Sequence, residues 1–218
     1  IENYGADTAR FFMLSDSPPN RDMEWSDSGV EGSWRFLNKL WKFVKSLPYK
    51  NTENELPKNI SSRNKELLTF MNTTVRDVTK AIDEFHFNIA VAQIRSLFNL
   101  VSSYKIENDN DKKTVLFVTS KLLILINPMV PHLAEELWAT LGNENSISKE
   151  YWPKVDVSYI KKDNIKIPIQ VNGKVRAVIE VPINLNKIEL EEIALKEKNV
   201  LKFLNKVPKK VIIVPNRI

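Results

Sequence analysis

The spacing of apolar residues changes once along this 218-residue chain, and that change limits how the chain can fold. Up to Gly142, apolar side chains recur every three or four residues, which is the period of an amphipathic helix. From Ile165 they recur at every second residue, which is the period of a strand with one buried face. We therefore expect an antiparallel helix bundle followed by a small sheet domain, with the boundary in the stretch 142–156.

The first part of the chain predicts a short helix and five longer ones. Ser26 or Asp27 is expected to cap the second helix, and Asn88 the fourth, with Ile89 on its core face. The polar stretch 107–113 is predicted to be a turn. The fifth helix is apolar on nearly all sides, so we expect it in the middle of the bundle. The expected helices cover about 5–14, 34–47, 62–85, 88 to beyond 101, 113–126 and 131–141.

The stretch IPIQVNGKVRAVIEVP, 167–182, predicts a hairpin around Asn172-Gly173. A two-residue turn would place Val171 opposite Lys174, and so mix apolar and basic residues on one face. A three-residue turn with a bulge and a left-handed Gly173 separates them. In that arrangement one face carries Ile165, Ile167, Ile169, Val175, Ala177 and Ile179, and the other carries Lys166, Gln170, Lys174 and Arg176.

A polar helix at about 188–204 and a last strand at 210–214 complete the expected second domain. The predicted fold is therefore multidomain, α plus α/β: a helix bundle followed by a small β-β-α-β domain. With a helix below the sheet, the basic row of the hairpin would form an exposed platform.

Charge is distributed unevenly between the two parts. Residues 154–218 carry 14 Lys and Arg against 7 Asp and Glu, while residues 1–153 carry 18 against 20. A basic segment favours a polyanionic partner, because each cation that neutralises a phosphate releases counterions. The platform lacks the aromatic pair that stacks bases, so shape recognition of RNA is favoured over base reading. An ordinary solvated sheet face is the competing interpretation.

Residues for catalysis or metal binding are scarce. The chain has no Cys and two His residues, His86 and His132, on different predicted helices. It has no Gly-rich phosphate loop, and its longest central apolar run, 122–126, is far too short to span a membrane. We expect no catalytic or metal-binding residue and no membrane association. One acidic group could in principle hold Mg²⁺, but solvation is the simpler expectation: Asp16, Asp22, Glu24, Asp27 and Glu31.

Two stretches carry a family resemblance. YGADTARFFMLSDSPPNRDMEWSDSGVEGSWRFLNKLW, 4–41, resembles bacterial-type leucyl-tRNA synthetases where the catalytic domain is followed by the helical anticodon-binding domain. IQVNGKVRA, 169–177, resembles the C-terminal domain of the same family. NPMVPHLAEELW, 127–138, is shared with valyl, isoleucyl and methionyl relatives, whereas MEWSDSGVEG together with VNGKVRA is typical of the leucyl family.

The resemblance implies a parent enzyme that uses ATP and Mg²⁺ to attach leucine to its tRNA in the cytoplasm. The family's two ATP-site signatures, His-Ile-Gly-His and Lys-Met-Ser-Lys-Ser, are absent, so this chain alone is expected to be inactive and to need no cofactor. The resemblance assigns 1–30 to the end of the catalytic region, 31–153 to the helical domain and 154–218 to the C-terminal domain. Together with the start at Ile1, it indicates a piece of a longer, monomeric ligase, next to its own catalytic domain.

The resemblance also favours particular contacts with leucine-accepting tRNA. The candidates on the terminal domain are Lys166, Lys174 and Arg176, followed by Lys209 and Lys210. Those on the helical domain form a stripe at helical spacing: Arg35, Lys39 and Lys42. Two other functions stay open: a free-standing RNA-binding protein, and a helical protein-interaction scaffold whose charge is incidental.

Overall fold

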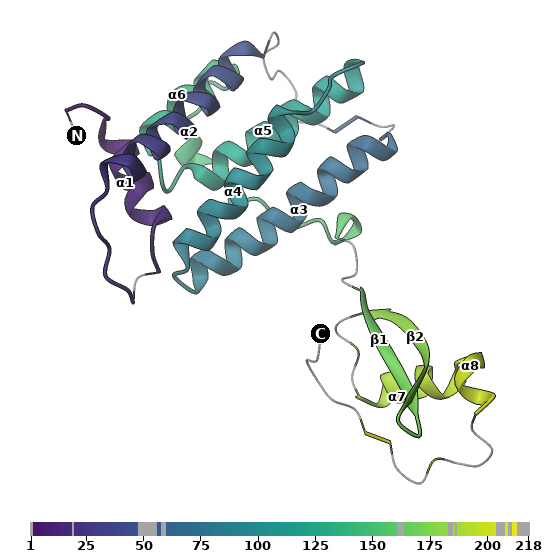
Figure 1. Cartoon of the computed structure of the whole chain (residues 1–218). Helices are drawn as coiled ribbons and strands as arrows, with labels where there is room; N and C mark the ends of the chain where they lie inside the picture. Colours follow the sequence, from purple (N-terminus) through teal and green to yellow (C-terminus); the bar gives the residue numbers. More distant parts are fainter. Residues whose placement is uncertain are drawn as a thin grey trace. The chain divides into compact units, whose positions relative to one another are not determined.

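The computed structural model describes residues 2–18, 20–47, 56–57, 60–160, 164–182, 185, 187–203, 208 and 211–212. The chain divides into two compact units, Ile1–Ile160 and Lys161–Ile218 (Figure 1). The first unit extends past the expected boundary at 153, because the residues after Pro153 still pack on the helices. The backbone N–H of Asp156, for example, donates to Asn72 Oδ1 at 2.8 Å.

All six expected helices are present in the first unit (Figure 1). Helix α5 lies in the middle of the core as predicted, with the whole run 122–126 buried. Two short 3-10 helices, η1 (Ile147–Lys149) and η2 (Val157–Tyr159), follow the sixth helix. The six α-helices are α1 (Ala6–Ser15), α2 (Asp27–Ser46), α3 (Ser62–Asp83), α4 (Phe87–Ser102), α5 (Asp109–Ile126) and α6 (Pro131–Thr140).

Two predicted helix starts are wrong. Helix α5 begins inside the stretch 107–113 that was predicted to be a turn, because Asn108 caps it by accepting the N–H of Asp111 at 3.0 Å. Helix α4 begins after His86 rather than after Asn88, and His86 makes no side-chain cap bond. Ile89, which was expected on the core face, is 46% exposed, because the buried face at this end of α4 is formed by Ala90 and Val91.

The start of α2 agrees with the prediction, since the Ser26 hydroxyl accepts the N–H of Gly29 at 3.3 Å. The helix is longer than its apolar pattern indicated, because the segment between this cap and Trp34 is also helical. Gly29 lies against the buried ring of Phe12, which brings α2 close to α1.

Helix α1 is joined to the start of α6 by two side chains. Asp7 accepts the backbone N–H of Leu133 at 2.7 Å and is hydrogen-bonded to His132 Nδ1 at 2.8 Å. Arg10 donates to the carbonyl oxygens of Pro128 at 2.9 Å and of Met129 at 3.2 Å. The stretches 4–41 and 127–138, both similar to tRNA synthetases in sequence, are therefore in contact.

Aromatic packing also ties α1 to α2 and α4. The rings of Phe11 and Phe36 stack with centroids 5.2 Å apart. The Arg95 guanidinium of α4 lies 5.1 Å from the Phe11 centroid and 5.0 Å from that of Phe36. Burial lowers the pKa of Arg95. Helix α1 therefore packs as part of the helix bundle, although the family resemblance assigned residues 1–30 to the end of the catalytic region.

The second unit contains a two-stranded antiparallel sheet of β1 (Asn164–Val171) and β2 (Lys174–Pro182). The predicted three-residue turn is wrong: Asn172 and Gly173, with φ of 53° and 77°, form a two-residue turn in which both residues are left-handed. The register then shifts between Ile169 and Gln170, so that Arg176 is the extra residue of a bulge. Beyond this bulge, the apolar residues of the two strands lie on the same face of the sheet.

Past the bulge, Ile165, Ile167 and Ile169 share a face with Ala177 and Ile179 as predicted, but the partners differ from those of a three-residue turn: Ile169 pairs with Ala177, Ile167 with Ile179 and Ile165 with Val181. Val175, predicted on the same face, pairs with Gln170 on the other one. The expected single helix is split at Glu197 into α7 (Lys187–Lys196) and α8 (Lys198–Leu201). Val200 of α8 is buried, as are Ile179 and Val181 of β2. These three are the buried apolar side chains among the described residues of the unit.

Most of the predicted last strand, 210–214, lies outside the described residues, and the two that are described, 211 and 212, are not in a strand. A helix bundle followed by a small β domain is confirmed. Among the described residues, no helix combines the length and apolar character needed to cross a membrane.

Candidate nucleic-acid interface

The predicted cationic stripe is present on α2. Arg35, Lys39 and Lys42 are all exposed, on the side of the helix opposite the buried Leu40 and Val44. Among the described residues, the only ion-pair partner of Arg35 is Glu31, with Nη1 and Oε1 3.9 Å apart and both side chains more than half exposed. An exposed pair at this distance contributes little, so the guanidinium stays available to an incoming anion.

Lys45 continues this stripe by one turn, although sequence reasoning did not single it out. Its Nζ lies 4.7 Å from the Trp41 ring centroid and 3.9 Å from Glu136 Oε1. The four cations span about 15 Å of helix, from the rise per residue. This extended arrangement suits a phosphate backbone better than a single phosphate group.

The predicted basic row on the hairpin is wrong in its geometry. Paired residues of antiparallel strands share a face. Lys174 pairs with Val171, and is therefore on the side of the apolar pairs near the turn. Three pairs on the other side of the sheet are Lys166 with Glu180, Pro168 with Val178, and Gln170 with Val175. These pairs contain one basic residue beside one acidic and four uncharged ones.

Arg176 is partly buried rather than displayed on an open platform. Its guanidinium carbon lies 3.9 Å from the ring centroid of Phe203, which follows α8. Its Nε is buried without a hydrogen-bond partner among the described residues. Phe203 is 44% exposed, so the Arg176–Phe203 pair presents a cation and an aromatic ring at the same place on the surface.

The other sequence-predicted residues can be placed only in part. Lys174 is exposed beside the turn. The side chain of Lys166 lies outside the described part of the structure, as do Lys209 and Lys210. Their contacts with RNA stay predictions.

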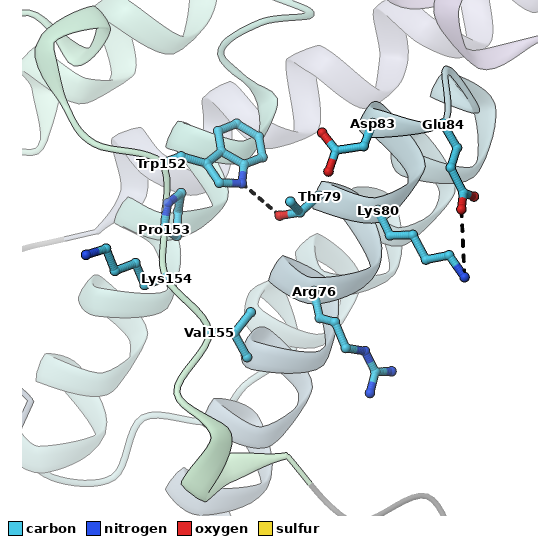
Figure 2. A pocket seen from close by; sticks show the side chains of 9 residues that line it. All are labelled: Arg76, Thr79, Lys80, Asp83, Glu84, Trp152, Pro153, Lys154 and Val155. Atoms are coloured by element: carbon cyan, nitrogen blue, oxygen red, sulfur yellow. Dashed lines mark hydrogen bonds and ion pairs between the residues drawn. The ribbon is translucent and has the colours of Figure 1, made fainter. Parts of the chain in front are cut away.

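A groove in the first unit was missed by sequence reasoning (Figure 2). It has a volume of about 520 Å³ and lies between α3 and the segment 152–155. Trp152 Nε1 donates to Thr79 Oγ1 at 2.8 Å across one end. The cations at the groove, Arg76, Lys80 and Lys154, are accompanied by Asp83 and Glu84, so it offers no strong field for a phosphate. In the sequence, the four-residue spacing of Arg76 and Lys80 indicates that both cations lie on one face of a helix, which is the signal that could have identified this side of the groove.

Metal binding receives no structural support in the described residues. No three His, Asp or Glu side chains in that part of the chain converge closely enough to hold an ion. The acidic residues of 16–31, which include Asp27 and Glu31 of α2, are within that part.

Residues 64–193 match a family model described as the anticodon-binding domain of tRNA ligase. The matched segment runs from α3 to α7, and so contains the hairpin with Lys174 and Arg176. The cationic stripe on α2 precedes it.

Curated leucine–tRNA ligases match the chain over its whole length. That of Prochlorococcus marinus (strain NATL1A) is 41% identical over 222 residues, which cover 100% of this chain and 25% of the relative. Those of Paramagnetospirillum magneticum and Desulfotalea psychrophila are 36% and 39% identical and are covered to 25% and 27%. The chain thus spans about a quarter of the length of these relatives.

A solved structure shows the same fold. The agnB2 LeuRS of Agrobacterium radiobacter K84, crystallised as a ternary complex with tRNA and LeuAMS, aligns with a TM-score of 0.70 and 26% sequence identity. The alignment covers 99% of this chain and 28% of that one.

Proposed function

Because the chain belongs to the anticodon-binding-domain family of tRNA ligases, we propose that it is the tRNA-holding part of a leucine–tRNA ligase. The observation that carries this proposal is the match to leucine–tRNA ligases over the whole chain, both units included. A structural relative of both units was crystallised with tRNA. The resemblance first seen in the sequence is thereby confirmed.

The chemistry of the ligase belongs to the remainder of the enzyme. Activation of leucine would use ATP and Mg²⁺ there, since neither ATP-site signature occurs in this sequence. The work of this chain is to bind and orient leucine-accepting tRNA. Once bound, the tRNA presents its acceptor end to the catalytic region, so that transfer of leucine becomes an effectively unimolecular step. We assign the ligase to the cytoplasm, as a monomer.

Two surfaces would contact the tRNA. On α2, the stripe Arg35, Lys39 and Lys42 would follow the phosphate backbone through charge–charge attraction. On the terminal unit, Lys174 would contact phosphate, and the guanidinium of Arg176, which lies over the Phe203 ring, would contact phosphate or an unpaired base. Lys166, Lys209 and Lys210 complete the set proposed for this unit.

Titration of the chain with leucine tRNA and with an unrelated tRNA at several salt concentrations tests the proposal. We expect binding that weakens steeply with salt and favours the leucine tRNA. Steep salt dependence without preference would assign specificity to the rest of the ligase. No binding to either tRNA would contradict the proposal and favour the protein-interaction scaffold.

The α2 stripe is tested by the triple variant Arg35→Glu, Lys39→Glu and Lys42→Glu. If each side chain neutralises one phosphate, the slope of log affinity against log salt should fall by roughly two to three. The matched control is Lys105→Glu, because Lys105 Nζ already lies 3.2 Å from Glu107 Oε1. An unchanged slope in a triple variant with a native circular dichroism spectrum would remove α2 from the interface.

A further inference from the structure

Phe85 has a backbone conformation that its residue type avoids. Helix α3 ends at Asp83 with Glu84 as its C-cap, and the next residue, Phe85, has φ of 59°. Two hydrogen bonds close the end of the helix: Phe85 N–H to Ile82 O at 3.0 Å and His86 N–H to Ala81 O at 2.7 Å. This is the Schellman pattern, whose left-handed position is usually occupied by glycine because a Cβ is strained there.

Helix α6 ends in the same pattern and uses glycine. Gly142 has φ of 92° and donates to Ala139 O at 2.9 Å, and Asn143 N–H donates to Trp138 O at 3.4 Å. A glycine at position 85 would therefore end α3 equally well. The phenylalanine must be explained by its side chain rather than by the turn.

That side chain contributes little to the packing of its own unit. Phe85 is 65% exposed, and its one ring partner among the described residues is Phe87, edge-on at 6.0 Å. Ile89, on the next turn of α4, is 46% exposed. Strained backbone that holds an exposed aromatic group is typical of contact sites, where an external interaction offsets the strain.

The charges around the turn favour a protein surface over RNA. Asp83 and Glu84 are both exposed beside Phe85. The carboxylate of Glu84 lies 3.9 Å from Lys80 Nζ and 3.5 Å from His86 Nδ1, whereas Asp83 forms no ion pair with another described residue. Two carboxylates next to the ring disfavour a phosphate backbone. They suit an apolar pocket with a basic rim.

We propose that Phe85, together with Phe87 and Ile89, is a docking point for the part of the ligase that this chain does not span. The inference rests on the proposed function, since the relatives devote about three-quarters of their length to segments outside the match. The turn between α3 and α4 lies at the end of the bundle where α1 packs (Figure 1). Phe85 would insert into an apolar pocket of that larger part, and Asp83 would pair with a cation at its rim.

Hydrogen exchange tests the docking directly. We would compare amide protection of residues 83–89 in this chain and in the full ligase, with and without tRNA. Greater protection in the full ligase without tRNA is the expected result. Equal protection in the two proteins would overturn the proposal. Protection that needs tRNA would identify RNA as the occupant, and protection that grows with protein concentration would identify a second copy; either result overturns it as well.

Phe85→Gly separates the strain from the contact. In this chain the variant should unfold at a higher temperature, because the strained residue is gone. In the full ligase it should lower both the protection of 83–89 and the rate of leucine transfer to tRNA. The matched control is Phe70→Ala, which removes an exposed ring from the regular part of α3. A full ligase that is unaffected by Phe85→Gly would overturn the proposal, whereas a wild-type ligase unable to charge leucine tRNA would overturn the proposed function instead.

Discussion

Gly29 and Gly32 lie one turn apart on α2 and should respond in opposite ways to alanine. A Cβ at Gly29 would lie 2.6 Å from Cε2 of the Phe12 ring, which is only 2% exposed. A Cβ at Gly32 would have no atom within 4 Å. We expect Gly32→Ala to stabilise the first unit by about 0.5–1 kcal/mol through helix propensity.

Gly29→Ala, by contrast, should destabilise it by about 1–3 kcal/mol through overpacking. Urea unfolding followed by circular dichroism measures both free energies of unfolding. The two variants serve as controls for each other, and a change of the same sign in both would contradict the argument.

Gly173 is a second glycine whose replacement has a definite consequence. Its φ of 77° is left-handed, and a Cβ there would meet no atom within 4 Å, so only backbone strain opposes a side chain. Gly173→Val should destabilise the hairpin by about 1–2 kcal/mol, because a β-branched residue resists this conformation. Gly173→Asn is the milder control, since asparagine tolerates it better. Unchanged thermal midpoint and RNA binding in the valine variant would show that the turn is not under this constraint.

At the scale of the elements, Asp7 of α1 supplies the cap that α6 lacks. Val130 precedes α6 and makes no side-chain cap bond, and Pro131 has no N–H to donate. The N–H of Leu133 is bonded instead by Asp7, from a helix distant in sequence. Removal of this carboxylate leaves the N–H of Leu133 unsatisfied and removes one of the two side-chain links between α1 and the start of α6.

We therefore expect Asp7→Ala to destabilise the first unit by about 1–2 kcal/mol. Asp7→Asn, which keeps one acceptor oxygen, should have a smaller effect. Chemical denaturation of the three proteins measures the difference. If alanine and asparagine were equally destabilising, the charge of Asp7 rather than its hydrogen bond to Leu133 would be responsible.

At the scale of the whole molecule, two units with separate cores should unfold separately. The apolar cluster of the bundle contains residues from all six helices, and the second unit has its own buried side chains on β2 and α8. A chain ended at Ile160 should keep a cooperative, helical unfolding transition. A broad, non-cooperative melt would show that the bundle needs the second unit.

The same truncation tests the division of tRNA binding. Residues 154–218 have 7 more basic than acidic side chains, whereas residues 1–153 have 2 fewer. The truncated chain should therefore bind tRNA more weakly and with a smaller salt dependence. Undiminished affinity would place the interface on the bundle alone.

Local pattern in the sequence determined the helices, the hairpin and the cationic stripe on α2. Each of these depends on neighbouring residues, since a period of 3.6 or 2 assigns side chains to a face without knowledge of the rest of the chain. The buried α5 and the Ser26 cap were predictable for the same reason. The α2 part of the candidate interface was therefore accessible from sequence.

Only the tertiary structure decided the remainder. Arg176 was predicted on an open face of the sheet, but it is the extra residue of a bulge in β2 and its guanidinium lies at the ring of Phe203. A single extra residue in a strand changes the face on which the residues beside it lie. The hydrogen bond from the Asp156 N–H to Asn72 packs the segment after Pro153 on α3, so that the first unit extends to Ile160. These outcomes depend on register and on contacts between residues far apart in the chain, and the spacing of residues along a sequence contains neither.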